Sequence, residues 1–158
     1  MDERLFAFKA AIAAVCSALG AFLGWKGLML LTWVLLMALD WLSGTFAAMK
    51  SGEWCSQKSR EGAWHKCGAI VVVIVAIIAD LIMQVICGNI PLLGIEWPAV
   101  ILPLVLAWYI LTELGSILEN AIKLGANPPA MLTKILKGGL AAVEAVGDAA
   151  AEEKTKIE

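Results

Sequence analysis

Charge is scarce in this chain of 158 residues. Only 16% of the residues are charged and 61% are hydrophobic, whereas ordinary soluble domains have about 25% charged and about 45–50% apolar residues. A soluble domain of this size buries only about 68–70% of the surface of its unfolded chain, so it could not hide this much apolar material. The composition therefore argues strongly against a soluble monomer, and against an enzyme with a wet catalytic cleft. It predicts a small integral membrane protein.

Residues that commonly carry chemistry are also few. Histidine occurs once, at His65, and two of the four cysteines lie in apolar runs, so no disulfide framework is indicated. Cys55, His65 and Cys67 fall in one loop, but a zinc site needs a fourth ligand and tighter spacing. The net charge of −2 gives no basic surface for nucleic acid. We predict no catalytic residue, no metal ion and no cofactor.

Long apolar runs are what the chain has instead. Four of them approach the length of about 20 residues that a membrane-spanning helix needs: about 5–24, 27–49, 68–87 and 98–124. The first has the length of a signal peptide, but it continues into another apolar stretch, so we interpret it as retained. Trp25–Gly27 is expected to be a tight turn, and Pro98 to lie in a first helical turn. We predict an all-α membrane domain over residues 1–125, with about four spans and three as the alternative.

The C-terminal segment, residues 126–158, predicts a different kind of helix. From Ala130 to Ala151 apolar residues keep helical spacing, and four charged residues fall between them: Lys134, Lys137, Glu144 and Asp148. These charges make the segment too amphipathic to span a membrane. We expect an amphipathic helix with a charged end, which lies on the inner leaflet or packs against other copies.

Basic residues indicate how the spans are oriented. The polar loop at 50–66 carries four of them and the loop at 88–97 carries none. Because cytoplasmic loops are enriched in lysine and arginine, the first loop is predicted to be cytoplasmic, and so are both termini. The residues that determine this topology are Lys50, Lys58, Arg60 and Lys66.

Acidic and amide side chains within the spans are the candidate functional residues. A charge in the bilayer core costs a few kcal/mol, so it usually faces protein or water. Two interpretations remain open: polar faces that line an aqueous opening or meet between copies, or acids bound to a neighbouring helix that fix its packing. The candidate pore-lining or oligomer-contact residues are Asp40, Asp80, Gln84, Glu113, Ser116 and Asn120. Asp80 and Gln84 share one helix face, and Glu113, Ser116 and Asn120 share another.

Small residues predict where helices approach closely in lipid. Gly20 and Gly24 form a GxxxG pattern, and Gly44 with Ala48 forms a looser pair of small residues. We expect these glycines to pack helices, either between copies or within one chain.

Two segments of the chain resemble a family of phage holins, the one that includes the clostridial toxin-secretion and phage-lysis holins. Their order, and the apolar spans that lie around them, also resemble that family. The first segment is ALDWLSG at Ala38–Gly44, followed by KSGE at Lys50–Glu53. The second begins at Glu113 and continues with SILEN at Ser116–Asn120, then a Leu-Gly and a Pro-Pro pair. Asp80 matches an aspartate in the intervening span of that family. The two matches cover about residues 34–137.

The resemblance implies a function. Holins accumulate in the bacterial cytoplasmic membrane, assemble into lesions at a set time and release a murein hydrolase, while some relatives export a large toxin. It implies self-association and a murein hydrolase (endolysin) as functional partner, with an antiholin as a further candidate. Two alternatives remain: an ion channel or proton-coupled transporter with Asp80 or Glu113 as its ion site, and a membrane adaptor that docks a partner through residues 51–66 or the tail.

Overall fold

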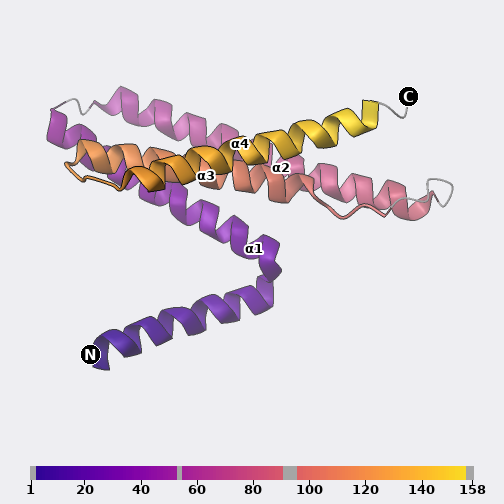
Figure 1. The fold of residues 1–158 in the computed structure, drawn as a ribbon, viewed down its shortest axis with the longest axis horizontal. Helices are drawn as coiled ribbons and strands as arrows, with labels where there is room; N and C mark the ends of the chain where they lie inside the picture. The colour runs from indigo at the N-terminus through magenta and orange to yellow at the C-terminus, as the bar shows by residue number, and fades with distance from the viewer. Residues whose placement is uncertain (1–2, 53–54, 91–95, 156–158) are drawn as a thin grey trace.

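Every regular element in the described part of the chain, residues 3–52, 55–90 and 96–155, is an α-helix (Figure 1). The computed structural model has four helices in these ranges: α1 (Glu3–Ser51), α2 (Ser56–Asn89), α3 (Ile101–Lys123) and α4 (Ala130–Thr155). Three segments of them are long and apolar enough to cross a bilayer: Gly24–Ser51, Gly62–Asn89 and Ile101–Lys123. The predicted all-α membrane class is confirmed.

Helix α1 breaks at a single residue. Gly24 has φ 67° and ψ 177°, inside what is otherwise continuous helix. A positive φ is open to glycine because it has no Cβ, so this residue replaces the tight turn expected at residues 25–27. Figure 1 shows the two halves of α1 diverging from this point. Residues 5–24 are helical, but almost all of their side chains lie outside the described set, so the fourth span stays a prediction.

Two helices begin at residues other than those expected. Helix α2 begins at Ser56, so most of the segment predicted as a polar loop is helix, and His65 and Cys67 lie on it. Helix α3 begins at Ile101, so Pro98 precedes the helix. The proline in the first turn is Pro103, at a position where the missing N–H would have no intrahelical acceptor.

Helix α3 is the centre of the bundle and contacts α1, α2 and α4. Large side chains of α1 and α3, Trp33 and Leu106, are almost fully buried between the helices. Helix α2 contributes the smaller Ala69 and Val73 to the same core. The other faces of α2 expose isoleucine, leucine and valine side chains, such as Val71 at 59%. This surface is what a helix bordered by lipid requires.

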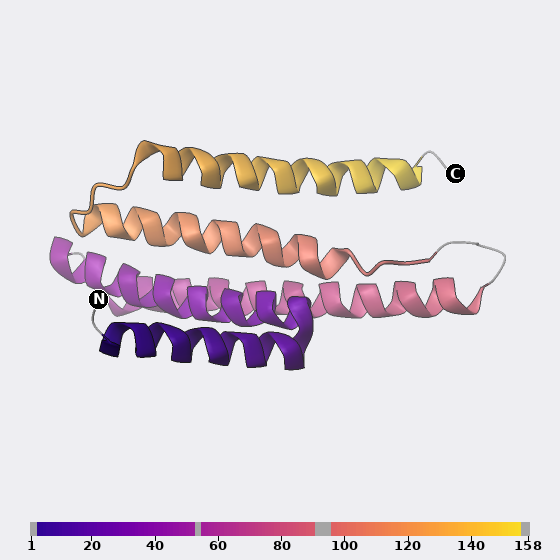
Figure 2. The ribbon, with the colours of Figure 1, turned by 60° about the horizontal axis from the view of Figure 1, so that its bottom comes forward.

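Helix α4 returns along the bundle beside α3, antiparallel to it (Figures 1 and 2). A Cβ placed at Gly139 would lie 3.5 Å from the Leu111 methyl groups, and the indole N–H of Trp108 donates to Glu144 Oε1 at 3.1 Å. The predicted helix from Ala130 is confirmed and extends to Thr155. From the sequence we expected α4 on the inner leaflet or against other copies, whereas in the structure it packs on α3 of the same chain.

Candidate functional site: two polar clusters between the helices

One lysine joins all three span helices. Lys66 on α2 donates to both carboxylate oxygens of Glu113 on α3, at 2.9 and 2.7 Å, and its ammonium lies 3.0 Å from Asp40 Oδ2 on α1. The side chains are mostly buried, with 19% exposure for Lys66 and 11% for Glu113. Two of the predicted intramembrane acids therefore have their cation within the chain.

An amide extends this group toward α1. Asn120 on α3 donates through Nδ2 to Asp40 Oδ1 at 3.0 Å and to Ser43 Oγ at 3.2 Å. The two oxygens of Asp40 thus have different partners, the amide for Oδ1 and the ammonium for Oδ2. Asp40, Ser43, Lys66, Glu113 and Asn120 form what we call the Lys66 cluster. Side chains from three helices are required to complete it.

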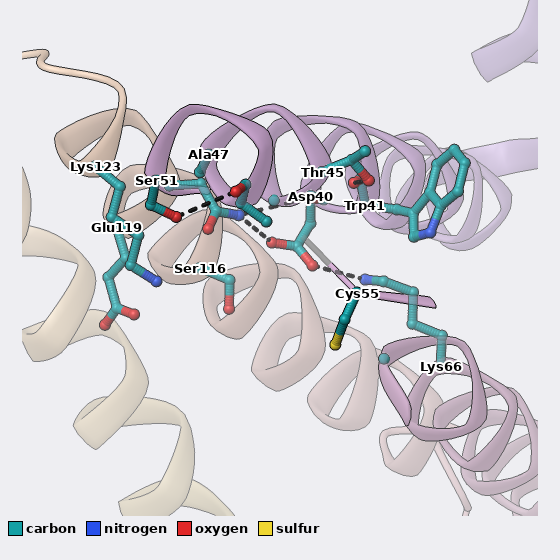
Figure 3. Close-up of a pocket in the computed structure, with 14 residues that line it drawn as sticks. Asp40, Trp41, Thr45, Ala47, Ser51, Cys55, Lys66, Ser116, Glu119 and Lys123 are labelled. Atoms are coloured by element: carbon teal, nitrogen blue, oxygen red, sulfur yellow. Dashed lines mark hydrogen bonds and ion pairs between the residues drawn. The ribbon is translucent and has the colours of Figure 1, made fainter. Parts of the chain in front are cut away.

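A cavity of about 590 Å³ borders this cluster. Asp40 from α1 and Lys66 from α2 point toward each other at its wall, as Figure 3 shows. Ser116, Glu119 and Lys123 of α3 line it as well. The wall therefore combines hydroxyl groups and charges of both signs at the end of the bundle where α1 ends and α2 begins.

Asp80 forms a second cluster at the opposite end of α3. Its Oδ1 accepts the indole N–H of Trp97 at 2.9 Å and the backbone N–H of Ile101 at 3.1 Å. Its Oδ2 accepts the backbone N–H of Leu102 at 2.8 Å. The first N–H groups of a helix have no intrahelical acceptor, and a carboxylate there also suits the helix dipole. We call this arrangement, in which α2 supplies the cap of α3, the Asp80 cap. Asp80 itself is 5% exposed.

Two further lysines attach α1 to both ends of α3. Lys26 Nζ donates to the carbonyl of Ala99, just before α3, at 2.9 Å. Lys50 Nζ donates to the carbonyl of Leu124, just after α3, at 2.6 Å. A cation at the C-terminal end of a helix interacts favourably with its last carbonyls. The relative axial position of α1 and α3 is therefore set at two points.

The structure brings only some of the predicted site residues together. Asp40, Glu113 and Asn120 meet in the Lys66 cluster, and Ser116 lies on the wall of the adjoining cavity. Asp80 lies apart from them: Ile101, which it caps, and Glu113 are separated by roughly 18 Å along α3. Gln84 is exposed on α2 although it lies one turn from the buried Asp80. A pore-lining role for these residues stays a prediction.

Sequence reasoning missed Lys66 as the partner of the acids. It assigned this lysine to the cytoplasmic loop together with Lys50, Lys58 and Arg60, but Lys66 lies inside α2. Of the others, Arg60 is exposed and Lys50 contacts the end of α3, while the side chain of Lys58 lies outside the described set. The usable signal was charge balance, since buried acids require a cation, and Lys66 is the basic residue at the edge of the most apolar of the three candidate spans.

The predicted packing glycines have different outcomes. Gly44 lies against Asn120 of the same chain, where an added Cβ would be 3.3 Å from Nδ2. No described atom lies within 4 Å of a Cβ placed at Gly24, which is the kink residue, so a contact there between copies stays a prediction. The immediate surroundings of Gly20 lie outside the described residues.

Enlarging residue 44 should disturb the Lys66 cluster. We expect Gly44→Leu to displace Asn120 and to cost about 1–3 kcal/mol, as overpacking of a filled site does. The measurement is the temperature at which the protein in detergent stops being monodisperse, which should be lower for the variant. Gly115→Leu on α3 is the matched control, because no described atom lies within 4 Å of a Cβ placed there. Equal destabilisation by both variants would contradict the close approach at Gly44.

These observations define a class of protein. The described residues form a small bundle of membrane-spanning helices whose polar side chains pair with one another, and they contain no group of three histidine, cysteine or acidic side chains that could hold a metal ion. The chain belongs to the bacteriophage holin family, whose family model matches residues 17–138. That match runs from before the kink of α1 to Gly138 in α4, well over half of the chain.

Neither the curated proteins nor the solved structures give a significant match to this chain. The resemblance of residues 34–137 to holins is confirmed by the family match, which includes that segment. The family is one of membrane proteins that act in phage lysis, and it is not a family of enzymes.

Proposed function

We propose that this protein oligomerises in the cytoplasmic membrane of a bacterial host and opens lesions that release a murein hydrolase. The observation that carries the proposal is the family match over residues 17–138. It falls on three helices that are long and apolar enough to span the membrane. The murein hydrolase is the proposed functional partner, an antiholin is a further candidate partner, and export of a large protein is the alternative cargo.

The pairing inside one chain supports harmless accumulation before lysis. Asp40 and Glu113 are bound by Lys66, and Asp80 is bound by the N-terminus of α3, while α2 presents exposed apolar side chains. The three span helices of a single copy can therefore reside in lipid without an unpaired carboxylate in the Lys66 cluster or the Asp80 cap. This pairing favours packing as the role of Asp40, Asp80, Glu113 and Asn120. Contact between copies remains the proposal for the exposed Gln84 and for Ser116.

Before lesions open, the proposed orientation places both termini in the cytoplasm. An even number of crossings is then required, so the N-terminal half of α1 must be the fourth span beside the three apolar segments. Reporter fusions to residue 1 and residue 158 test this directly. A cytoplasmic C-terminus with an external N-terminus would support three spans.

Expression with a hydrolase tests the function. The chain is induced together with a cytoplasmic murein hydrolase that has no export signal. We expect a delay followed by abrupt lysis, whereas the chain alone should stop growth and release cytoplasmic protein without breaking the wall. The hydrolase alone is the control and should leave the culture intact. Graded, ion-specific flux without hydrolase release would identify a channel or transporter instead.

A further inference from the structure

Helix α4 has three distinct faces, and one of them is charged. Four charged side chains are exposed on it: Lys134, Lys137, Glu144 and Asp148. They follow one another after three, seven and four residues, so they lie on one side of the helix. We call these four residues the charged stripe. A second face, around Leu136 and Val143, is half-buried against α3 and includes Gly139. A third face is exposed and apolar, with Met131, Ile135 and Val146 at 69%, 59% and 54% exposure.

The charged stripe runs beside a membrane span. Gly139 lies against Leu111 and Glu144 against Trp108, and the two helices are antiparallel. This register places Lys134 level with about residue 116 of α3 and Asp148 with about residue 102, since both helices rise by 1.5 Å per residue. All four charges therefore lie between the ends of α3. The stripe is roughly 21 Å long, against a hydrocarbon thickness of about 30 Å.

Lipid cannot cover such a stripe. Lysine and aspartate cost about 2.5–3.5 kcal/mol each at the centre of a spanning helix, and only Glu144 among the four has a described partner, Trp108. Asp40, Asp80 and Glu113 of the spans differ, because the chain itself pairs them. The contact between α3 and α4 is thus compatible with a bilayer only where water reaches the outer side of α4.

We propose that α4 forms the wetted wall of the lesion, supported from behind by α3. Because α4 is antiparallel to α3, its C-terminal end then lies at the external side of the opening, in contrast to its cytoplasmic position before lesions form. The charged stripe faces the water-filled opening, the face around Leu136 and Val143 packs on α3, and the exposed apolar face meets lipid or the neighbouring copy. This inference rests on the proposed lesion-forming function. It assigns the lumen to the tail helix, whereas the Lys66 cluster and the Asp80 cap hold the bundle together. Glu144 and Asp148 lie beyond the family match, which ends at residue 138.

Cysteine cross-linking tests where α4 lies. In a background that lacks the native cysteines, Leu111→Cys and Gly139→Cys are combined and oxidised in membranes after lesions have formed. We expect a disulfide within the chain, since these positions are in contact. The matched control pairs Leu111→Cys with Ala141→Cys, two residues from Gly139 and so on the opposite side of α4, and it should form no disulfide within the chain. Absence of the 111–139 disulfide would place α4 away from α3, as on the membrane surface, and would overturn the inference.

Thiol labelling then tests which face is wet. Ala141→Cys lies on the side of the charged stripe and Ala142→Cys on the neighbouring apolar side, so the two variants differ in direction but not in depth or in the residue replaced. In membranes open on both sides, a charged maleimide should modify residue 141 at least several-fold faster than residue 142. Equal slow rates together with the 111–139 disulfide would overturn the wetted wall.

Lysis measured on the same variants separates the two proposals. Variants that still release the hydrolase but fail the cross-linking or labelling test contradict only the role of α4. A cysteine-containing parent chain that releases no hydrolase contradicts the lesion-forming function itself, whatever the position of α4. Release of the hydrolase, the 111–139 disulfide and fast labelling of residue 141 together support both proposals.

Discussion

Lys66→Met should have the largest effect of any single substitution in the spans. It removes the cation that Asp40 and Glu113 share and leaves two carboxyl groups facing each other between helices. Loss of one partner from a buried ion pair costs about 3–5 kcal/mol, a large part of the stability of a small domain. We expect the variant to accumulate poorly and to unfold in detergent at a much lower temperature. Protein level in membranes and the thermal midpoint in detergent measure this.

Removing the acids as well should rescue that variant. Lys66→Met combined with Asp40→Asn and Glu113→Gln retains groups of similar shape without unpaired charge, and replacing a whole ionic group is often neutral. Arg60→Met is the matched control, because it removes an exposed cation from the same helix. If Arg60→Met is as damaging as Lys66→Met, or if the triple variant is no better than the single one, the Lys66 cluster is not what holds the three helices.

Asp80→Ala should delay or abolish lysis while membrane insertion stays normal. The change removes the oxygens that accept from the indole of Trp97 and from two backbone N–H groups at the start of α3, those of Ile101 and Leu102. Each of these two backbone donors costs about 1–3 kcal/mol if it stays unsatisfied, so the start of α3 is released from α2. Asp80→Asn keeps one acceptor oxygen and should have an intermediate effect. The measurement is the time of lysis at equal membrane content of each variant.

Gln84→Ala provides the comparison for Asp80. Gln84 lies one turn further along α2 but is exposed, so Gln84→Ala leaves the Asp80 cap intact and tests only the proposed contact of Gln84 with another copy, for which we expect a smaller shift in timing than for Asp80→Ala. A shift as large as that of Asp80→Ala would instead indicate that both side chains meet another copy. Unchanged timing for Asp80→Ala at equal expression would contradict the importance of the cap.

Periodicity along one helix was a sound guide to the fold and to parts of the site. It correctly placed Glu113, Ser116 and Asn120 on one side of α3, since two of them join the Lys66 cluster and the third lines the adjoining cavity. It also found the start of α4 at Ala130. It could not show which face meets which neighbour, because that depends on the rotation and axial position of each helix. For this reason the sequence did not show that Lys66 pairs with the acids, and it grouped the buried Asp80 with the exposed Gln84.

Helix boundaries were less predictable for a different reason. The residues after Ser56 are mostly polar and charged, which indicates a loop by hydropathy, but they form the first turns of α2 because they include no proline and their one glycine, Gly62, is tolerated. At Gly24 the composition gives no sign that this glycine, rather than Gly20 or Gly27, adopts the positive φ. Hydropathy reports how apolar a segment is and not which backbone conformation it adopts, so it could not fix either boundary.

The attachments at Lys26 and Lys50 restrict how the bundle can rearrange. With α1 bonded to α3 at both ends, the two helices cannot slide past each other along the membrane normal without losing both bonds. They can move together as one rigid pair, to which the Lys66 cluster and the Asp80 cap also join α2, and against which α4 changes position. Distances between spectroscopic labels on α1 and α3 should therefore stay constant from the first appearance of the protein in the membrane through to lysis, while distances from α3 to α4 report the transition.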